Sequence, residues 1–130
     1  MSSRKRVLIV DDHSVNRTVA TLHLRGTDWD SAQAVDGFDA LDKLSKEAFD
    51  CVLLDMSMPG MSGQEVCQKI RADERLHALP VVAYTAHALE SEVQQIRESG
   101  FDDVLLKPIK RANLLEALNA ATSKIGRAHV

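Results

Sequence analysis

The sequence predicts an α/β domain in which a parallel five-stranded sheet is covered by helices on both faces. Short apolar runs recur along the chain, and between them apolar residues return at helical spacing. Continuous apolar runs are typical of strands that are buried on both faces, as in parallel sheets. The alternation of strand and helix favours right-handed crossovers, and 130 residues are the usual size of one domain.

The predicted strands are five short segments, most of them continuously apolar. They are VLIV (7–10), SAQAV (31–35), CVLLD (51–55), VVAYT (81–85) and DVLLK (103–107). The Pro59-Gly60 pair after the third segment and Pro80 before the fourth are typical of the ends of elements.

Five amphipathic helices are predicted between and after these strands. Their apolar residues are Val15, Val19 and Leu22; Phe38, Leu41 and Leu44; Val66 and Ile70; Leu89, Val93 and Ile96; and Leu114, Leu118 and Ala121. Spacings of three and four residues place the members of each set on one helix face. Gly100 is typical of the end of the fourth helix.

Composition and charge exclude several classes of protein. The chain has 16 basic and 19 acidic residues, so no basic excess favours nucleic-acid binding. Cys51 and Cys67 are too few and too irregularly placed for a disulfide framework or a zinc site, which favours reduced thiols in a cytoplasmic protein. No apolar stretch is long enough for a signal peptide or a membrane span.

One domain is expected to fill residues 4–123, and residues 124–130 are predicted to be a tail. The segment IGRAHV at 125–130 is what the sequencing-adaptor codons ATC GGA AGA GCA CAC GTC encode. Our hypothesis is that this tail is artefactual and that the natural chain continues differently. Finding these codons in re-sequenced DNA of the source locus would refute it.

Polar residues follow four of the predicted strands at the point where each strand ends. The first strand runs into Asp11 and Asp12, the third ends in Asp55, the fourth ends in Thr85 and the fifth ends in Lys107. Parallel α/β sheets bind ligands at this edge, so we expect these groups to form one site. Three carboxylates in one pocket repel one another unless a cation joins them.

The residue types indicate phosphoryl chemistry assisted by a metal. Oxygen ligands suit Mg²⁺, which retains waters and also holds phosphate. Asp55, on the middle strand, could attack a phosphoryl group and form an acyl phosphate. The metal, the ammonium of Lys107 and the hydroxyl of Thr85 would neutralise the phosphoryl oxygens during transfer.

Four segments together resemble the receiver domain of two-component response regulators, a family that includes chemotaxis regulators. They are VLIVDDHSVNR, LLDMSMPGMSG, VVAYTAHA and LLKPI, and the resemblance covers the chain from about residue 5 to 122. It implies a single flavodoxin-like, doubly wound domain with strand order 2-1-3-4-5 and five helices. It also implies a phosphoacceptor that switches a partner-binding surface, and not an enzyme with conventional turnover.

The resemblance implies a Mg²⁺ site built from four residues. Asp12 matches the acid that binds the metal directly, and Asp11 beside it acts largely through water. Asp55 completes the carboxylate set, and Ser57 would offer its backbone carbonyl to the metal.

The resemblance also implies the reaction and its partners. Asp55 matches the residue that takes a phosphoryl group from a sensor histidine kinase or a histidine phosphotransfer protein. Thr85 matches the hydroxyl residue that turns toward this group, and Lys107 matches the lysine that pairs with it across a usually cis peptide to Pro108. The downstream partner is a separate protein or a fused output domain, with homodimerisation on phosphorylation as a further candidate.

One position departs from the family pattern. Many receivers carry Tyr or Phe three residues before the lysine, where this chain has Val104. Tyr84 does not substitute for it, because neighbours of Thr85 point to the opposite sheet face. We therefore expect Thr85 to reposition the helix near 89–99 without the rotation of an aromatic ring.

The histidines show no metal-ligand spacing and are expected to be surface or satisfied side chains. His87, two residues after Thr85, is the partial exception, because this position and that of Ser57 tune acyl-phosphate hydrolysis in the family.

Three alternatives remain open at this point. A Mg²⁺-dependent, aspartyl-nucleophile phosphatase of the haloacid dehalogenase type needs a second Asp where this chain has Ser57. A flavodoxin needs a phosphate-binding loop after the first strand, where this chain has DDHSVNRT. A degenerate receiver that acts only as a docking module would lack acceptor-site groups, all of which are present.

Overall fold

A computed structural model describes residues 4–86 and 89–127, and within them it confirms the predicted α/β fold with five strands and five helices. The parallel strands form one sheet in the predicted order β2-β1-β3-β4-β5. They are β1 (Lys5–Val10), β2 (Trp29–Ala34), β3 (Cys51–Asp55), β4 (Val81–Thr85) and β5 (Asp103–Leu106). The helices are α1 (Ser14–His23), α2 (Gly37–Lys46), α3 (Gly63–Ala72), α4 (Glu90–Glu98) and α5 (Arg111–Arg127).

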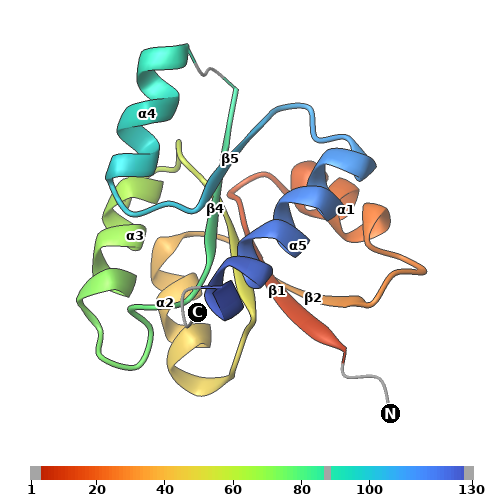
Figure 1. Ribbon diagram of the computed structural model, residues 1–130, viewed down its shortest axis with the longest axis horizontal. Helices are drawn as coiled ribbons and strands as arrows, with labels where there is room; N and C mark the ends of the chain where they lie inside the picture. The colour runs from red at the N-terminus through yellow and green to blue at the C-terminus, as the bar shows by residue number, and fades with distance from the viewer. Residues whose placement is uncertain (1–3, 87–88, 128–130) are drawn as a thin grey trace.

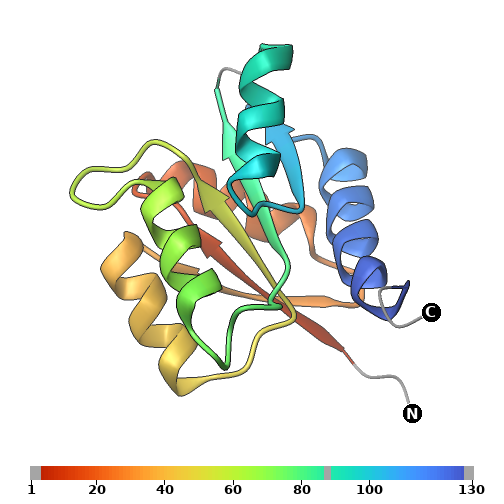
Figure 2. The same ribbon diagram turned by 60° about the vertical axis from the view of Figure 1, so that its left-hand side comes forward.

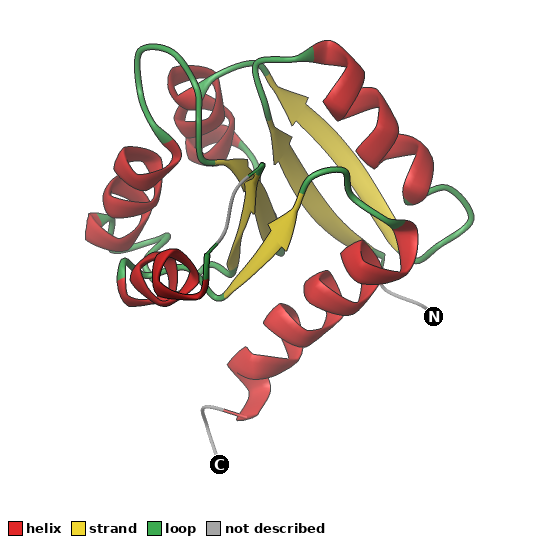
Figure 3. Ribbon diagram, turned by 90° about the horizontal axis from the view of Figure 1, so that it is seen from above, coloured by secondary structure: helices red, strands yellow, loops and turns green. Residues whose placement is uncertain are grey.

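The sheet separates two apolar cores. Helices α1 and α5 cover one face, and α2, α3 and α4 cover the other (Figures 1 and 3). Strand side chains alternate between these cores: one core takes Leu8, Val10, Val52, Leu54, Val81 and Ala83, and the other takes Val7, Ile9, Cys51, Leu53, Val82 and Tyr84. Because both strand faces are buried, these runs have no reason to alternate with polar residues.

Strand β2 differs from the prediction, because it begins at Trp29 and ends at Ala34 and does not span 31–35. It lies at the edge of the sheet, beside β1, so part of its surface is solvated and its apolar signal is weak. Trp29 is 3% exposed, and its indole Nε1 donates to Oδ1 of Asn119 in α5 at 3.1 Å. This buried indole ties the edge strand to the last helix.

The apolar stripe of α1 lies outside the core. Val15 is 70% exposed and Leu22 is 51% exposed, whereas Ala20 is the buried residue of this helix. Helical spacing identifies an apolar face, but the rotation of the helix on the sheet decides what that face meets. Here the small side chain of Ala20 meets the sheet.

The last helix continues to Arg127, although the sequence indicated no helix in IGRAHV. Extending an existing helix adds one hydrogen bond for each residue that is fixed. Residues of low helix propensity can therefore continue a helix that has already formed. Within the part of the chain that the structure describes, every helix is too short or too polar to span a lipid bilayer.

Candidate functional site

The predicted site residues meet at the carboxyl edge of the sheet. Asp11 follows β1, Asp55 ends β3, Thr85 ends β4 and Lys107 follows β5. The strands β1, β3, β4 and β5 are neighbours in this order, so their ends lie side by side (Figure 2). The ammonium of Lys107 lies 3.1 Å from Oδ1 of Asp55, two residues that are far apart in sequence. This confirms that the polar strand ends share one edge.

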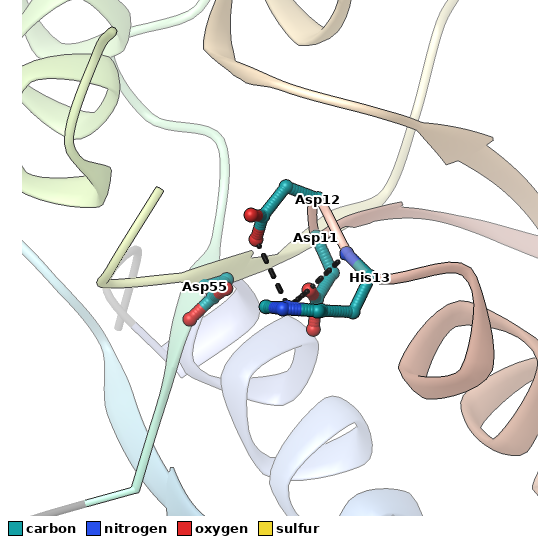
Figure 4. A group of neighbouring side chains, drawn as sticks. All are labelled: Asp11, Asp12, His13 and Asp55. Carbon is teal, nitrogen blue, oxygen red and sulfur yellow. Dashed lines mark hydrogen bonds and ion pairs between the residues drawn. The ribbon is translucent and has the colours of Figure 1, made fainter. Parts of the chain in front are cut away.

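Four side chains form a compact cluster at this edge. One ligand atom from each of Asp11, Asp12, His13 and Asp55 lies within 4.8 Å of all the others (Figure 4). Within the described chain, Asp11 Oδ2, Asp12 Oδ1 and Asp55 Oδ2 are buried and accept no hydrogen bond. Burying carboxylate oxygens without hydrogen bonds is costly, so the grouping of these three carboxylates fits a hard divalent cation such as Mg²⁺.

Asp11 is held by the turn that leads from β1 into α1. Its backbone N–H donates to the carbonyl of Ala34 at 3.2 Å, and its Oδ1 accepts the backbone N–H of His13 at 2.9 Å. The guanidinium of Arg17 donates to its carbonyl oxygen at 2.7 Å. The carboxylate thus accepts the His13 N–H through Oδ1, at the point where α1 begins, while its buried Oδ2 accepts no hydrogen bond within the described chain.

Asp55 is 1% exposed, and its Oδ1 accepts hydrogen bonds from Lys107 Nζ at 3.1 Å and from the Ser57 N–H at 3.2 Å. Burial raises the pKa of the Asp55 carboxyl above its usual value, and these two hydrogen bonds offset the rise only in part. The negative charge of Asp11 adds to the rise. A cation at the cluster would therefore stabilise the ionised form of Asp55.

Helix α3 packs directly behind β3, the strand that ends in Asp55. A Cβ at Gly63 would collide with the backbone carbonyl oxygen of Asp55, so the first turn of α3 approaches β3 as closely as backbones allow. A capping box between Ser62 and Glu65 fixes this end of the helix. The first turn of α3 therefore supports the backbone that positions Asp55.

Tyr84 is a site neighbour whose contact with Lys107 the sequence did not indicate. The ammonium of Lys107 lies 4.6 Å from the centroid of its ring, a distance suited to a cation–π contact. Burial, together with the charges of Asp11 and Asp55, raises the pKa of Tyr84 to about 12. Tyr84 packs in the α1/α5 core and Val104 packs against the other, which confirms that they lie on opposite sheet faces.

The histidines differ in their surroundings. His23 Nε2 lies 3.1 Å from the carbonyl oxygen of Ile109, so the expectation of a satisfied side chain is confirmed for His23. His13 is a surface side chain, as expected, because it is 68% exposed, and its Nδ1 lies 3.2 Å from Asp12 Oδ1. It also belongs to the acidic cluster that could hold a metal ion, which the spacing of the histidines did not indicate. Only its place beside the two acids signalled this. His87 lies outside the described residues.

A cleft of about 470 Å³ adjoins the acidic cluster. It is lined by Asp12, His13, Ser14, Val15, Asn16 and Lys107. The Lys107–Pro108 peptide beside it is cis, as the resemblance implies. The backbone N–H of Lys107 donates to the carbonyl of Thr85 at 2.8 Å, which keeps the ends of β4 and β5 together.

The comparison with protein families agrees with this geometry. The family described as "Response regulator receiver domain" matches residues 7–119. The chain belongs to the response regulator receiver domain family. This membership excludes the flavodoxin and haloacid dehalogenase alternatives as the family of the chain.

Relatives of this receiver domain include free-standing and fused proteins. Chemotaxis protein CheY-3 of Vibrio cholerae is 38% identical over 120 residues, which are 92% of each chain. Sensor histidine kinase RcsC of Salmonella typhi is 40% identical over 119 residues, which are 92% of this chain and 12% of the kinase. The chain therefore spans only a small part of the kinase relatives that it matches.

Solved receiver structures have the same fold. The receiver domain of sensor histidine kinase PA1611 from Pseudomonas aeruginosa PAO1 is 30% identical, with a TM-score of 0.83 and coverage of 93% of this chain and 99% of that one. That structure has a magnesium ion coordinated in its active site cleft. Chemotaxis protein CheY4 of Vibrio cholerae is 28% identical, with a TM-score of 0.85 and coverage of 92% and 99%.

Proposed function

We propose that this receiver domain accepts a phosphoryl group on Asp55, in a Mg²⁺-dependent reaction, and does not act as a conventional turnover enzyme. The observation that carries the proposal is the pair of Asp55 and Lys107, set beside three buried carboxylate oxygens without hydrogen-bond partners. This arrangement provides a nucleophile, a positive charge and ligands for a cation at one edge of the sheet.

In the proposed step, a carboxylate oxygen of Asp55 attacks the phosphorus of a phosphohistidine. The new O–P bond forms an acyl phosphate, and the N–P bond breaks with its electron pair returning to the donor imidazole. The ammonium of Lys107 and the hydroxyl of Thr85 would face the phosphoryl oxygens and neutralise their charge. Lys107 already lies within hydrogen-bond distance of the acceptor carboxylate.

The metal would be held by Asp12, Asp55 and the backbone carbonyl of Ser57, with Asp11 acting through water. When bound, Mg²⁺ supplies positive charge against the oxygens of the transferring group. The three buried carboxylate oxygens that accept no hydrogen bond within the described chain support this ligand set. The magnesium ion in the PA1611 receiver structure supports it by similarity.

The phosphoryl donor is proposed to be a sensor histidine kinase or a histidine phosphotransfer protein, and the domain to act in the cytoplasm. The output is proposed to pass to a downstream protein or a fused domain, with homodimerisation on phosphorylation as a further route and no direct contact with nucleic acid. Similarity to receiver segments of sensor kinases and to CheY-3 supports these partners.

The switch is proposed to act through Thr85 without an aromatic ring flip, because Val104 occupies the usual aromatic position. Movement of the Thr85 side chain toward the phosphoryl group would shift the following loop and α4. NMR spectra of the phosphorylated and unphosphorylated forms should therefore differ in residues 86–99. Identical shifts in that segment would contradict the proposed route.

The experiment that tests acceptor function is the intact mass of the protein after incubation with Mg²⁺ and acetyl phosphate. We expect the gain of one phosphoryl group, which is lost in Asp55→Asn and on addition of a chelator. Asp42→Asn is the matched control, because Asp42 is an exposed aspartate of α2 that pairs with Lys46. This variant should be phosphorylated like the wild type.

Other outcomes of this experiment point to the alternatives. If neither acetyl phosphate nor phosphohistidine proteins add mass, the chain is a degenerate receiver that serves as a docking module. If the donor is consumed over many turnovers with no trapped adduct, the aspartyl phosphatase activity is supported in place of the switch.

A further inference from the structure

We propose that the imidazole of His13 is a nitrogen ligand of the divalent-cation site and that it shifts the site's preference toward transition metals. The proposal rests on the proposed function, because it adds one ligand to the same cluster. It predicts that Ni²⁺ or Co²⁺ binds this receiver domain more tightly than the carboxylates alone would allow.

The spacing of the ligand atoms fits one coordination sphere. His13 Nδ1 lies 3.2 Å from Asp12 Oδ1 and 3.4 Å from Asp11 Oδ1, and one atom from each cluster member lies within 4.8 Å of the rest (Figure 4). In an octahedral site with bonds of about 2.1 Å, adjacent ligands are about 3 Å apart and opposite ligands about 4.2 Å apart. The observed separations fall close to this range before any cation draws the ligands together.

Burial shows that the cluster is more than a group of surface acids. Asp11 and Asp55 are almost completely buried, and each keeps one oxygen, Oδ2, that accepts no hydrogen bond within the described chain. These oxygens would line the inner side of the site. His13 is exposed, so its ring would bind from the solvent side.

Two hydrogen bonds hold the backbone of His13 beside the acidic cluster. Its N–H donates to Asp11 Oδ1 at 2.9 Å, and its carbonyl accepts the N–H of Arg17 at 3.2 Å as α1 begins. The side chain therefore starts from an anchored position beside both acids.

A nitrogen ligand changes which metals a site prefers. Mg²⁺ favours oxygen ligands and gains little from imidazole, whereas Co²⁺, Ni²⁺ and Zn²⁺ bind imidazole well. Replacing the imidazole by an amide should therefore weaken transition-metal binding and leave Mg²⁺ binding unchanged.

The test is calorimetric titration of tag-free protein with Ni²⁺ and, separately, with Mg²⁺, at a mildly alkaline pH where imidazoles are neutral. The variant is His13→Asn, because Asn is favoured at the start of a helix and should preserve α1. The matched control is His77→Asn, an exposed histidine outside the cluster. Absorption spectra of the Co²⁺-loaded proteins report directly whether a nitrogen ligand is lost.

We expect His13→Asn to weaken Ni²⁺ binding about 10-fold or more, with the Mg²⁺ constant and the His77→Asn constants unchanged. The Co²⁺ spectrum should change in His13→Asn alone. Unchanged Ni²⁺ binding in His13→Asn would overturn the proposal. Equal weakening of both metals would also overturn it, because His13 would then act through charge or backbone position.

Phosphorylation by acetyl phosphate with Mg²⁺, measured on the same samples, separates the two proposals. Normal Asp55 phosphorylation with His13-independent Ni²⁺ binding would refute the nitrogen ligand and leave the acceptor function standing. If Ni²⁺ binding depends on His13 but neither acetyl phosphate nor phosphohistidine proteins phosphorylate the protein, the acceptor function alone would be refuted.

Discussion

The two ends of the sheet differ in how their charged groups are paired. At the amino end of β4 and β5, Arg71 of α3 donates to the carbonyl oxygens of Gly100 and Leu79 and pairs with Asp102 at 3.1 Å. Oδ2 of Asp102 also accepts the N–H of Val81 at 2.8 Å. Each polar group named here is satisfied by the chain itself.

At the carboxyl end, three carboxylates converge and each keeps one buried oxygen that accepts no hydrogen bond within the described chain. Lys107 supplies one ammonium and reaches Asp55. The amino end of the sheet thus carries a network that the chain itself completes, whereas the carboxyl end carries one that a cation or phosphoryl group would complete. Both ends carry charged residues, but only at the carboxyl end do buried carboxylate oxygens accept no hydrogen bond within the described chain. Buried polar atoms without hydrogen bonds are therefore a better indicator of the candidate site than charge alone.

The largest expected effect is on stability, at the amino end. Arg71→Ala should lower the free energy of unfolding by roughly 2–4 kcal/mol, because it leaves carbonyl groups and Asp102 without their charged donor. Urea denaturation measures this change, and Arg75→Ala, at an exposed arginine nearby, is the control. At a temperature where the variant is folded, its phosphorylation should be normal. A loss of phosphorylation would show that the amino-end network also affects the site at the carboxyl end.

The next largest effect is expected from Mg²⁺ binding at the carboxyl end. Mg²⁺ at 100 times its dissociation constant should raise the free energy of unfolding by about 2.7 kcal/mol, as expected for a ligand that binds only the folded state. Urea denaturation with and without Mg²⁺, at matched ionic strength, measures it. Arg71→Ala should show the same increment, and Asp12→Ala should show little. An increment of equal size in Asp12→Ala would place the cation elsewhere.

A smaller gain in stability is expected from removing the charge of Asp55. Because burial raises the pKa of Asp55, the ionised carboxylate destabilises the folded state at neutral pH. Asp55→Asn should therefore have a higher free energy of unfolding than the wild type at neutral pH. The folded wild type binds the extra proton first, so its deficit disappears as the pH falls through the folded pKa toward the usual 3.8.

Urea midpoints of both proteins, measured without divalent cations across this pH range, test the expectation. A difference that stays constant with pH would mean that charge at Asp55 is not its source.

The smallest effect is expected at an exposed ion pair near the amino end. Arg4 Nη2 lies 2.8 Å from Asp30 Oδ1, and both side chains are about half exposed. Water and salt screen such a pair, so Arg4→Ala should leave the urea midpoint and the phosphorylation rate unchanged. A clear loss of stability would show that ion pairing stabilises the amino end even where the paired side chains are exposed.

The sequence was sufficient to predict the fold and the edge that carries the site. Parallel strands bring their carboxyl ends together whatever the details of packing, so Asp11, Asp55 and Lys107 could be placed at one edge from their positions alone. The short contact between Lys107 and Asp55 follows from that placement.

The orientation of helices and side chains could not be predicted in the same way. The apolar stripe of α1 is real, yet the helix turns Ala20 toward the sheet and Val15 toward solvent. The positions of Lys107 over the Tyr84 ring and of His13 beside the acids depend on side-chain rotamers set by tertiary packing. These contacts have no signature in the local spacing of residues.

The buried indole of Trp29 has a practical consequence for optical experiments. It is the single tryptophan of the chain, and its partner Asn119 and the ammonium of Lys5, 5.7 Å from its ring, belong to the end of the sheet opposite the acidic cluster. Its emission should therefore follow the loss of the α1/α5 core on unfolding. Tyr84, beside Lys107, is the chromophore that events in the pocket should reach first. In one sample, the Trp29 signal should therefore report unfolding and the Tyr84 signal should report ligand binding.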